Sequence, residues 1–216
     1  MKQALSFFDL FCDVFIYPRK TIRAIIDQDT NYWVWPIILT ISLLSTLDPT
    51  AETYLVGKMP LGAALLLGTL VSFAIMFGAF WLVIWFIYFM GKILGGKGTF
   101  DEVKAAYTWG AVPAIIGFLF DGVGKSSIWI NLLSGETDRM ALLGSPVLLW
   151  QKIDLFIYSF MFIWSMVLDV IAVSEAHQIS KLRSCVIGIL EIIFLFLVLA
   201  ILSTVFAVIY VSALRH

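Results

Sequence analysis

A run of thirty residues, from 61 to 90, contains no Asp, Glu, Lys, Arg or His. A helix needs roughly 20 mainly apolar residues to cross about 30 Å of hydrocarbon, so this run is longer than a single crossing requires. At about 1.5 Å per residue it would measure about 45 Å, which requires a tilt, a kink or an end that projects from the bilayer. The run therefore predicts a transmembrane helix.

The composition extends this conclusion to the whole chain. Of the 216 residues, 61% are hydrophobic and 13% are charged, and the mean hydropathy is +0.98. A water-soluble domain with these proportions would have too few polar residues to cover its apolar side chains. The formal net charge of −1 provides no general attraction to nucleic acid. We therefore predict a multi-pass membrane protein whose first partner is the lipid bilayer, and we expect no nucleic acid partner.

Four further apolar stretches accompany the run at 61–90. The stretch at 33–47 is short and opens with Trp33 and Trp35, aromatic residues of the kind that anchor helices at a membrane interface. The predicted fold class is all-α, a polytopic membrane helical bundle with five transmembrane helices and an N-terminal amphipathic interfacial segment. The five helices are expected at 33–47, 61–90, 104–120, 150–173 and 185–212.

The distribution of basic residues predicts the orientation of this bundle. The N-terminal segment and the loops at 91–104 and 174–184 together carry nine Lys and Arg residues, whereas the other side carries five over longer segments. Cytoplasmic loops carry an excess of Lys and Arg, so the N-terminus is expected in the cytoplasm and the C-terminus outside. Cys12 then lies in the reducing compartment with Cys185 close to it, and neither is expected in a stable disulfide.

The first 31 residues are predicted to form a cytoplasmic amphipathic segment, followed by the bundle of 32–216 within one domain, 1–216. Between 7 and 16 the acidic and aromatic residues fall largely on different helical faces. After Pro18, three basic residues lie opposite three isoleucines, as expected of a segment along an anionic inner surface. A membrane anchor is favoured over a partner-binding face. The candidate lipid- or partner-binding residues are Phe8, Phe11, Phe15, Arg19, Lys20, Arg23, Lys97 and His177.

Small residues recur at four-residue spacing in two of the predicted spans. Ala106, Gly110 and Ala114 form one such seam, and 64, 68 and 72 are small in the span at 61–90. Small residues let helices approach closely in lipid, so both spans are expected inside the bundle, and a homo-oligomer joined through them is one interpretation. Pro113 removes a backbone donor and is expected to kink its span.

Three acidic residues fall within the predicted spans, where ionisable groups are expensive. Asp169 and Glu191 lie at similar depths on antiparallel helices, and we expect them to share a cavity in the inner leaflet. One interpretation is a proton or cation path, with Asp154 nearer the outside. The other, which we favour because these residues lie toward span ends, is a structural hydrogen-bonded network. The candidate polar intramembrane site comprises Asp154, Tyr158, Ser165, Asp169 and Glu191.

The glycine-rich loop at 95–99 superficially resembles a phosphate-binding loop. It lacks the Gly-x4-Gly-Lys-Ser/Thr order and the preceding strand, so a tight cytoplasmic turn is the better interpretation. Thr99, followed by Asp101 and Glu102, is typical of a helix N-cap with acidic residues in the first turn. His177, beside Glu175 in the 174–184 loop, is expected to hydrogen-bond locally, with pH sensing or partner binding as alternatives.

No catalytic or metal centre is expected. The two cysteines and two histidines have no spacing of a metal site, and the serines at 126, 127 and 134 have no accompanying His and acid in a triad. We therefore predict no catalytic residues, no metal and no cofactor, and the protein is not expected to be an enzyme. The segment at 121–149 is expected to form a surface helix or hairpin at the outer interface.

Four sequence segments carry a resemblance to a known family. They are Gly-Gly-Lys-Gly-Thr-Phe-Asp-Glu-Val from residue 95 with Tyr107 and Pro113 after it, Tyr-Pro-Arg-Lys-Thr-Ile at 17–22, Ile-Trp-Ser at 163–165, and Ser-Glu-Ala-His-Gln-Ile-Ser-Lys at 174–181. In this order, relative to five spans, they resemble the Yip family of membrane proteins, named for interaction with Ypt/Rab GTPases.

The resemblance implies five passes, a cytoplasmic N-terminus, a single helical domain and no known catalytic centre. Eukaryotic relatives are associated with vesicle traffic and carry a longer N-terminal region. This chain is similar to the compact prokaryotic branch, which implies a prokaryotic cytoplasmic membrane and does not carry over Rab binding. The expected function is non-enzymatic organisation of membranes or membrane-protein partners. The alternative is a small proton or cation channel or transporter that uses the intramembrane carboxylates.

Overall fold

The computed structural model describes residues 6–135 and 149–213. These residues are helical or lie in turns and loops, apart from an isolated bridge between Val56 and Met59. The elements are α1 (Phe7–Ile16), α2 (Pro18–Gln28), α3 (Val34–Leu44), the 3-10 turn η1 (Ser45–Leu47), α4 (Thr50–Leu55), α5 (Leu61–Ile93), α6 (Phe100–Gly110), α7 (Val112–Gly124), α8 (Ser126–Leu133), α10 (Leu149–His177) and α11 (Lys181–Ala213).

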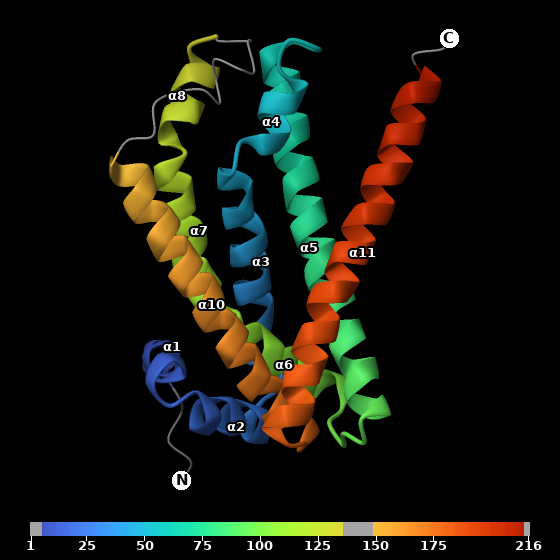
Figure 1. Ribbon diagram of the computed structural model, residues 1–216. Helices are drawn as coiled ribbons and strands as arrows, with labels where there is room; N and C mark the ends of the chain where they lie inside the picture. The colour runs from blue at the N-terminus through green and yellow to red at the C-terminus, as the bar shows by residue number, and fades with distance from the viewer. Residues whose placement is uncertain (1–5, 136–148, 214–216) are drawn as a thin grey trace.

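The helices form a bundle with two distinct ends (Figure 1). The helices α3, α5, α7, α10 and α11 run along the bundle, whereas α1 and α2 lie across one end, which we call the α2 end. The turns that join α5 to α6 and α10 to α11 lie at the same end. The short helices α4 and α8 lie at the opposite end, which we call the α8 end.

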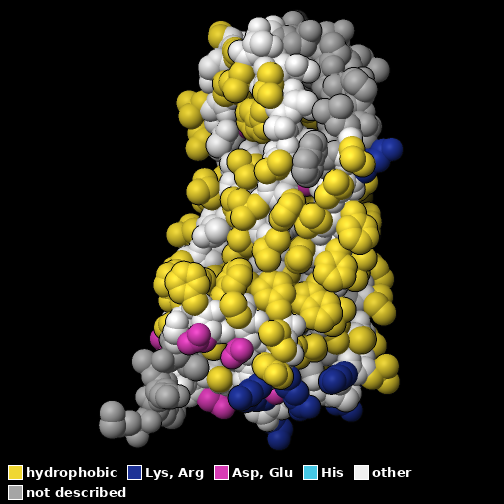
Figure 2. All heavy atoms as spheres, turned by 90° about the vertical axis from the view of Figure 1, so that its left-hand side faces the viewer, with side chains coloured by type: hydrophobic (Ala, Val, Ile, Leu, Met, Phe, Trp, Pro, Cys, Tyr) yellow, Lys and Arg dark blue, Asp and Glu magenta, His cyan; other side chains and the backbone are white. Residues whose placement is uncertain are grey.

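The described residues contain two helices that are long and apolar enough to cross a membrane. These are α5 and the Lys152–His177 part of α10, and α6 with α7 makes a third if the bent pair is one span. The apolar stretch Val34–Leu47 measures only about 21 Å at 1.5 Å per residue, less than the hydrocarbon thickness. Figure 2 shows hydrophobic side chains over the middle of one face and Lys and Arg gathered at the α2 end. The fold is therefore an all-helical bundle with two or three candidate membrane spans.

The predicted kink in the third apolar stretch is confirmed. Helix α6 ends at Gly110, α7 begins at Val112, and the two are bent by 40°. Pro113 lies in the first turn of α7, where a missing backbone donor breaks no helical hydrogen bond. The predicted N-cap is confirmed too, because the Thr99 hydroxyl accepts from the Glu102 amide while the Glu102 carboxylate accepts from the Thr99 amide.

The main core lies toward the α2 end and includes α1. Trp109 of α6 is fully buried and donates its indole N–H to the Tyr32 carbonyl over 3.0 Å. Leu10 and Val14 of α1 pack in the same cluster as Trp109 and Leu168 of α10. The N-terminal helix is therefore an integral part of the bundle.

The small-residue seam of α6 and α7 is used inside the chain. A Cβ added at Gly110 would lie 2.7 Å from Asp169 Oδ1, and one added at Gly117 would lie 3.5 Å from Tyr158 and Met161, all on α10. These glycines allow α10 to approach closely. On α5, a Cβ at Gly68 would lie 2.7 Å from the Glu52 side chain of α4, whereas one at Gly78 would meet nothing within 4 Å.

The expectation of a surface helix after the third stretch is met by α8 within 126–133, and 136–148 lies outside the described residues. Trp129 of α8 donates its indole N–H to the Leu47 carbonyl over 2.7 Å. The helix α8 therefore contacts the end of η1. The short helix α4 was not predicted.

Candidate functional site

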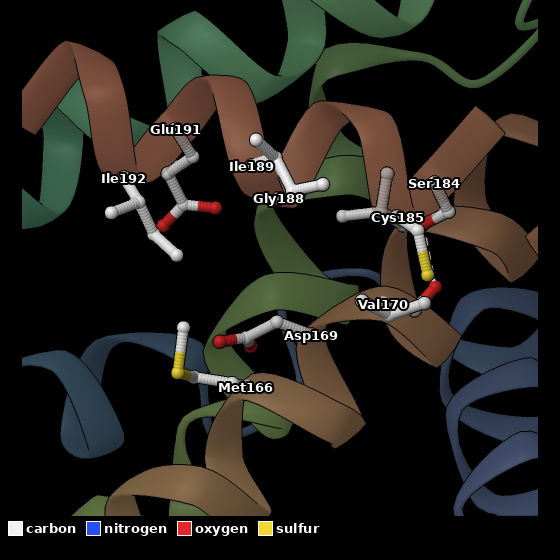
Figure 3. Close-up of a pocket in the computed structure, with 10 residues that line it drawn as sticks. Met166, Asp169, Val170, Ser184, Cys185, Gly188, Ile189, Glu191 and Ile192 are labelled. Atoms are coloured by element: carbon white, nitrogen blue, oxygen red, sulfur yellow. Dashed lines mark hydrogen bonds between the residues drawn. The ribbon is translucent and has the colours of Figure 1, made fainter. Parts of the chain in front are cut away.

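A cavity of about 220 Å³ lies between α10 and α11, and we call it the acidic cavity (Figure 3). Asp169 of α10 and Glu191 of α11 both line it, as their similar depths on antiparallel helices predict. Asp169 precedes the end of α10 by eight residues and Glu191 follows the start of α11 by ten, which places them about 12 and 15 Å from the α2 end of their helices. Most of the remaining wall is apolar, with Met166, Val170 and Ile189 among its residues.

Each of the two carboxylates has a different polar environment. The Tyr107 hydroxyl of α6 donates to Glu191 Oε1 over 3.2 Å. Oδ1 of Asp169 is buried against Gly110 and has no hydrogen-bond partner among the described residues. In the described parts of the chain, none of the ion pairs involves Asp169 or Glu191. Both acids therefore lie at the cavity without a cationic side chain from these parts to offset their charge.

The other three residues of the predicted polar site lie elsewhere. Ser165 donates its hydroxyl to the Gly110 carbonyl over 3.2 Å and so joins α10 to α6. Asp154 is buried toward the α8 end, close to Gly124, and Tyr158 packs edge-on against Phe118. The polar residues of α10 therefore do not form one site. They are spread along a long helix, and of them only Asp169 lines the cavity.

The role of Tyr107 was missed by the prediction of site residues. It precedes Gly110 by three residues and so shares one helical face with the glycine that contacts Asp169. That spacing was a usable signal, because Gly110 belongs to the small-residue seam that was expected to face neighbouring helices.

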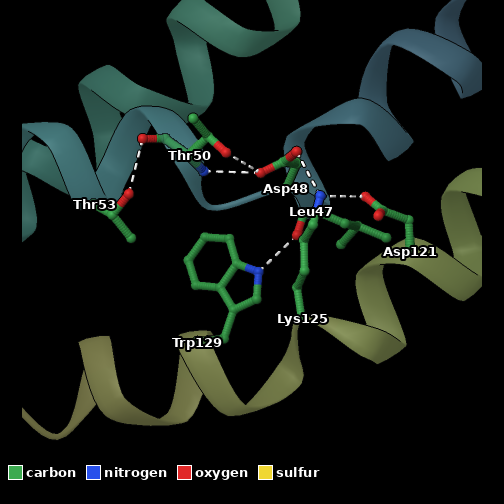
Figure 4. A network of polar contacts seen from close by, with 7 residues as sticks. All are labelled: Leu47, Asp48, Thr50, Thr53, Asp121, Lys125 and Trp129. Atoms are coloured by element: carbon green, nitrogen blue, oxygen red, sulfur yellow. Dashed lines mark hydrogen bonds and ion pairs between the residues drawn. The ribbon is translucent and has the colours of Figure 1, made fainter. Parts of the chain in front are cut away.

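A second polar cluster connects three elements at the α8 end (Figure 4). Nζ of Lys125 donates to Asp48 Oδ2 over 2.7 Å and to Asp121 Oδ2 over 2.8 Å. The amide and hydroxyl of Thr50 donate to Asp48 Oδ1. Lys125 therefore holds the connection between η1 and α4 against α7.

The charges in this cluster shift two pKa values in opposite directions. Burial alone would raise the pKa of Asp48, but the hydrogen bond and charge of Lys125 hold it below its ordinary value of 3.8. Burial alone would lower the pKa of Lys125, but its bonds to Asp121 and Asp48 raise it above 10.5. The Asp48 contribution is present above pH 3.8 and is lost as the pH falls, and the Lys125 contribution is present below pH 10.5 and is lost as the pH rises.

Replacing Lys125 with Met is expected to lower the free energy of unfolding at pH 7 by about 1 kcal/mol, because these partly exposed pairs are screened by solvent. The difference from the unmodified protein should shrink as the pH falls below 3.8, because Asp48 takes up a proton in the unfolded chain before it does so in the folded protein. Thermal unfolding in detergent as a function of pH measures this, with the exposed Lys20→Met as control. A Lys125→Met effect that stays constant from pH 7 to pH 3 would contradict it.

The structure corrects the placement of His177. The residue is the last of α10 and is fully buried, whereas we expected it in the loop between two spans. Neither ring nitrogen has a hydrogen-bond partner among the described residues, so the expected local hydrogen bond is not found. The glycine loop packs over His177. A Cβ added at Gly96 would lie 2.6 Å from His177 Nδ1, and one added at Gly98 would lie 2.5 Å from the Ala176 carbonyl oxygen. The Lys97 amide donates to the His177 carbonyl over 2.9 Å. The glycines therefore make room for the end of α10, and the Lys97 side chain is exposed.

The helix α2 is held against α10 by ion pairs with Glu175, whose side chain is only 8% exposed. Nε of Arg19 pairs with one carboxylate oxygen. Nη2 of Arg23 lies 3.0 Å from the other and also donates to the Glu175 backbone carbonyl over 2.7 Å. Both arginines, which we expected to face anionic lipid, bind a side chain of the bundle instead, and Lys20 remains exposed.

The three candidate phenylalanines of α1, which are Phe8, Phe11 and Phe15, do not share one face. Phe11 and Phe15 pack against the main core, whereas Phe8 is 75% exposed. Ile16 is 66% exposed and Cys12 is exposed too, so Phe8, Cys12 and Ile16 form an apolar stripe on the outer face of α1, beside the exposed Asp9 and Asp13. We call α1 and α2 together the amphipathic platform, because one side packs on the bundle and the other remains uncovered.

Comparisons with known proteins give one finding on identity. No curated protein and no solved structure matches the chain significantly. The Yip1 domain, however, matches residues 12–210, a range that begins within α1 and ends within α11 and so includes both α2 and the acidic cavity. Because this match covers nearly the whole sequence, the chain belongs to the Yip1 domain family.

Proposed function

We propose that this protein is a non-enzymatic, five-pass membrane protein that uses its amphipathic platform to organise membranes or membrane-protein partners. The passes would be α3 with η1, α5, α6 with α7, α10 and α11. The N-terminus would lie in the cytoplasm and the C-terminus outside, in a prokaryotic cytoplasmic membrane. The observation that carries the proposal is the docking of α2 on buried Glu175, which holds an uncovered apolar face of α1 beside the bundle.

The chemistry of the platform suits a membrane interface. Phe8, Ile16 and Tyr17 expose apolar surface on α1 and at its end, and Lys20 is exposed on α2. Helices with this division lie in the interface plane, with apolar side chains at the boundary of headgroups and acyl chains and basic side chains near anionic lipid.

The position of basic residues supports the proposed orientation. Lys and Arg side chains gather below the hydrophobic surface at the α2 end (Figure 2). Cytoplasmic surfaces carry such an excess. A platform at this end would present itself to cytoplasmic partners or to the inner leaflet. The basic residues of this end include Arg19, Lys20, Lys92, Lys97, Lys181 and Arg183.

A fluorophore on Cys12, attached in a Cys185→Ser background because Cys185 is exposed too, tests this placement in vesicles. Cys12 is exposed on α1, so a label there is expected to be quenched by lipids brominated near the glycerol and less by lipids brominated at the chain end. Replacing Phe8 and Ile16 together with Ser should reduce this quenching and weaken recruitment of the partner or localisation, without unfolding the bundle, because both residues are exposed. A water-exposed label with no quenching, or unchanged recruitment in the variant, would contradict the proposal.

The second candidate function is a proton- or cation-coupled path through Asp169 and Glu191, the two acids of the acidic cavity. Such a path would have to continue to Asp154 toward the α8 end. The cavity lining on α10 runs only from Met166 to Val173, and Ser165, next along the helix, is bonded to α6. This arrangement supports a local site over a continuous path. A homo-oligomer joined through Ala74 and Gly78, the exposed small residues of α5, is a further part of the proposal.

A further inference from the structure

The acidic cavity has the composition of a binding site for an organic cation. Its two acids come from different helices, and their carboxyl groups reach into the space between α10 and α11 (Figure 3). One oxygen of Asp169 is buried and has no hydrogen-bond partner among the described residues. Neither Asp169 nor Glu191 takes part in an ion pair among those residues. Unpaired carboxylates in a medium of low dielectric constant are stabilised by a proton or a bound cation.

The walls distinguish between classes of cation. Metal ions such as Mg²⁺ and Ca²⁺ take about six or more oxygen ligands, whereas this cavity adds to its two carboxylates mainly apolar side chains, with one thioether, one thiol and one hydroxyl. The described residues contain no group of three or more His, Cys, Asp or Glu that could hold a metal ion. An ammonium group attached to an apolar chain matches both features, since its charge meets the acids and its carbon atoms meet Met166, Val170 and Val173.

The volume and the exposed rim set the size of the ligand. At about 30 Å³ for each water-sized unit, 220 Å³ holds roughly seven such units, enough for an ammonium group with a short alkyl segment. Ile189 and Ile192 of the lining are exposed on the outside of α11, so a longer chain would continue into the surrounding lipid.

The cavity also lies near the level of α1. The Phe7 ring packs on the Trp109 ring at 5.9 Å between centroids, and Gly110, the next residue, contacts Asp169. If α1 lies at the interface, as the proposed function holds, the cavity lies where headgroups meet acyl chains.

We propose that the acidic cavity binds the alkylammonium group of an amphiphile at the inner membrane interface, and this rests on the membrane placement proposed above. The group could come from an aminophospholipid headgroup or from a free amphiphilic amine, which share this chemistry. Asp169 and Glu191 provide the negative charge, and Tyr107, through its hydrogen bond, orients Glu191.

The two cysteines provide a test with an internal control. Cys185 lines the cavity and is exposed, whereas Cys12 is exposed on α1. The full chain, in phosphatidylcholine nanodiscs, would be treated with N-ethylmaleimide in the presence of hexylammonium. At ten times its Kd, hexylammonium is expected to slow modification of Cys185 about tenfold and to leave Cys12 unchanged. Nanodiscs that contain phosphatidylethanolamine would test the lipid source in the same way.

Matched controls decide each outcome. Protection by hexylammonium alone assigns a free amine, and protection by phosphatidylethanolamine assigns the lipid headgroup. Asp169→Asn with Glu191→Gln should abolish protection, whereas Asp154→Asn, which removes an acid outside the cavity, should retain it. Equal protection by hexanol, equal protection by NaCl, or no protection at all would overturn the proposal. Because the readout is local to α11, such a failure would leave the Cys12 quenching result of the proposed function intact.

Discussion

Replacing Arg19 and Arg23 together with Ala is expected to destabilise the protein by about 3 kcal/mol, the cost of leaving a buried carboxylate without its cationic partners. Glu175 is nearly buried and both of its cationic partners would be lost. For a chain of this length the midpoint of thermal unfolding should fall by about 10 °C. Thermal unfolding in detergent measures the change.

The same variant should also release α2 from the bundle. Limited proteolysis is expected to cleave near residue 28 much faster than in the unmodified protein, because the contacts of α2 with α10 depend on the buried ion pairs. Lys20→Ala is the matched control, since its side chain is exposed on the same helix. An Arg19→Ala/Arg23→Ala protein with unchanged stability and proteolysis would show that the ion pairs do not hold the platform.

Replacing Gly98 with Ala is expected to cost about 3 kcal/mol, at the upper end of the usual cost of overpacking. The new Cβ would lie 2.5 Å from the Ala176 carbonyl oxygen, and a backbone atom cannot move aside as the end of a side chain can. The glycine loop would have to lift from His177, which lies directly beneath it. Thermal unfolding in detergent measures this loss.

Gly62→Ala provides the control for Gly98→Ala. A Cβ at Gly62 would meet nothing within 4 Å, and in a helix Ala is favoured over Gly by up to about 1 kcal/mol. Gly62→Ala should therefore leave the stability unchanged or raise it. Equal stabilities of the two variants would contradict the packing of the glycine loop on α10.

The apolar runs predicted the long helices because a run of that length without charge has few alternatives in a membrane. The runs at 61–90, 150–173 and 185–212 fall within α5, α10 and α11. Local signals also predicted the bend at Pro113 and the N-cap at Thr99, since both depend on neighbours in sequence. The five-pass topology stays a prediction, because Val34–Leu47 is shorter than a full crossing.

The partners of the candidate residues could not be predicted in the same way. Arg23 and Glu175 are 152 positions apart, and Tyr107 and Glu191 are 84 apart. The amphipathic pattern identified the basic face of α2, but it could not distinguish a lipid headgroup from a buried carboxylate as its partner. For His177, the burial depends on how the glycine loop folds over the end of α10, which the local sequence does not specify.

The most direct test of an organising function, as opposed to a transport path, is proton and monovalent-cation flux in proteoliposomes. The unmodified protein would be compared with a folded, correctly inserted Asp169→Asn/Glu191→Gln variant. We predict that neither protein supports flux above that of protein-free vesicles, because the lining of the acidic cavity on α10 ends at Met166 and does not continue to Asp154. Flux through the unmodified protein that collapses in the variant would contradict this account and would make the two carboxylates part of a transport path.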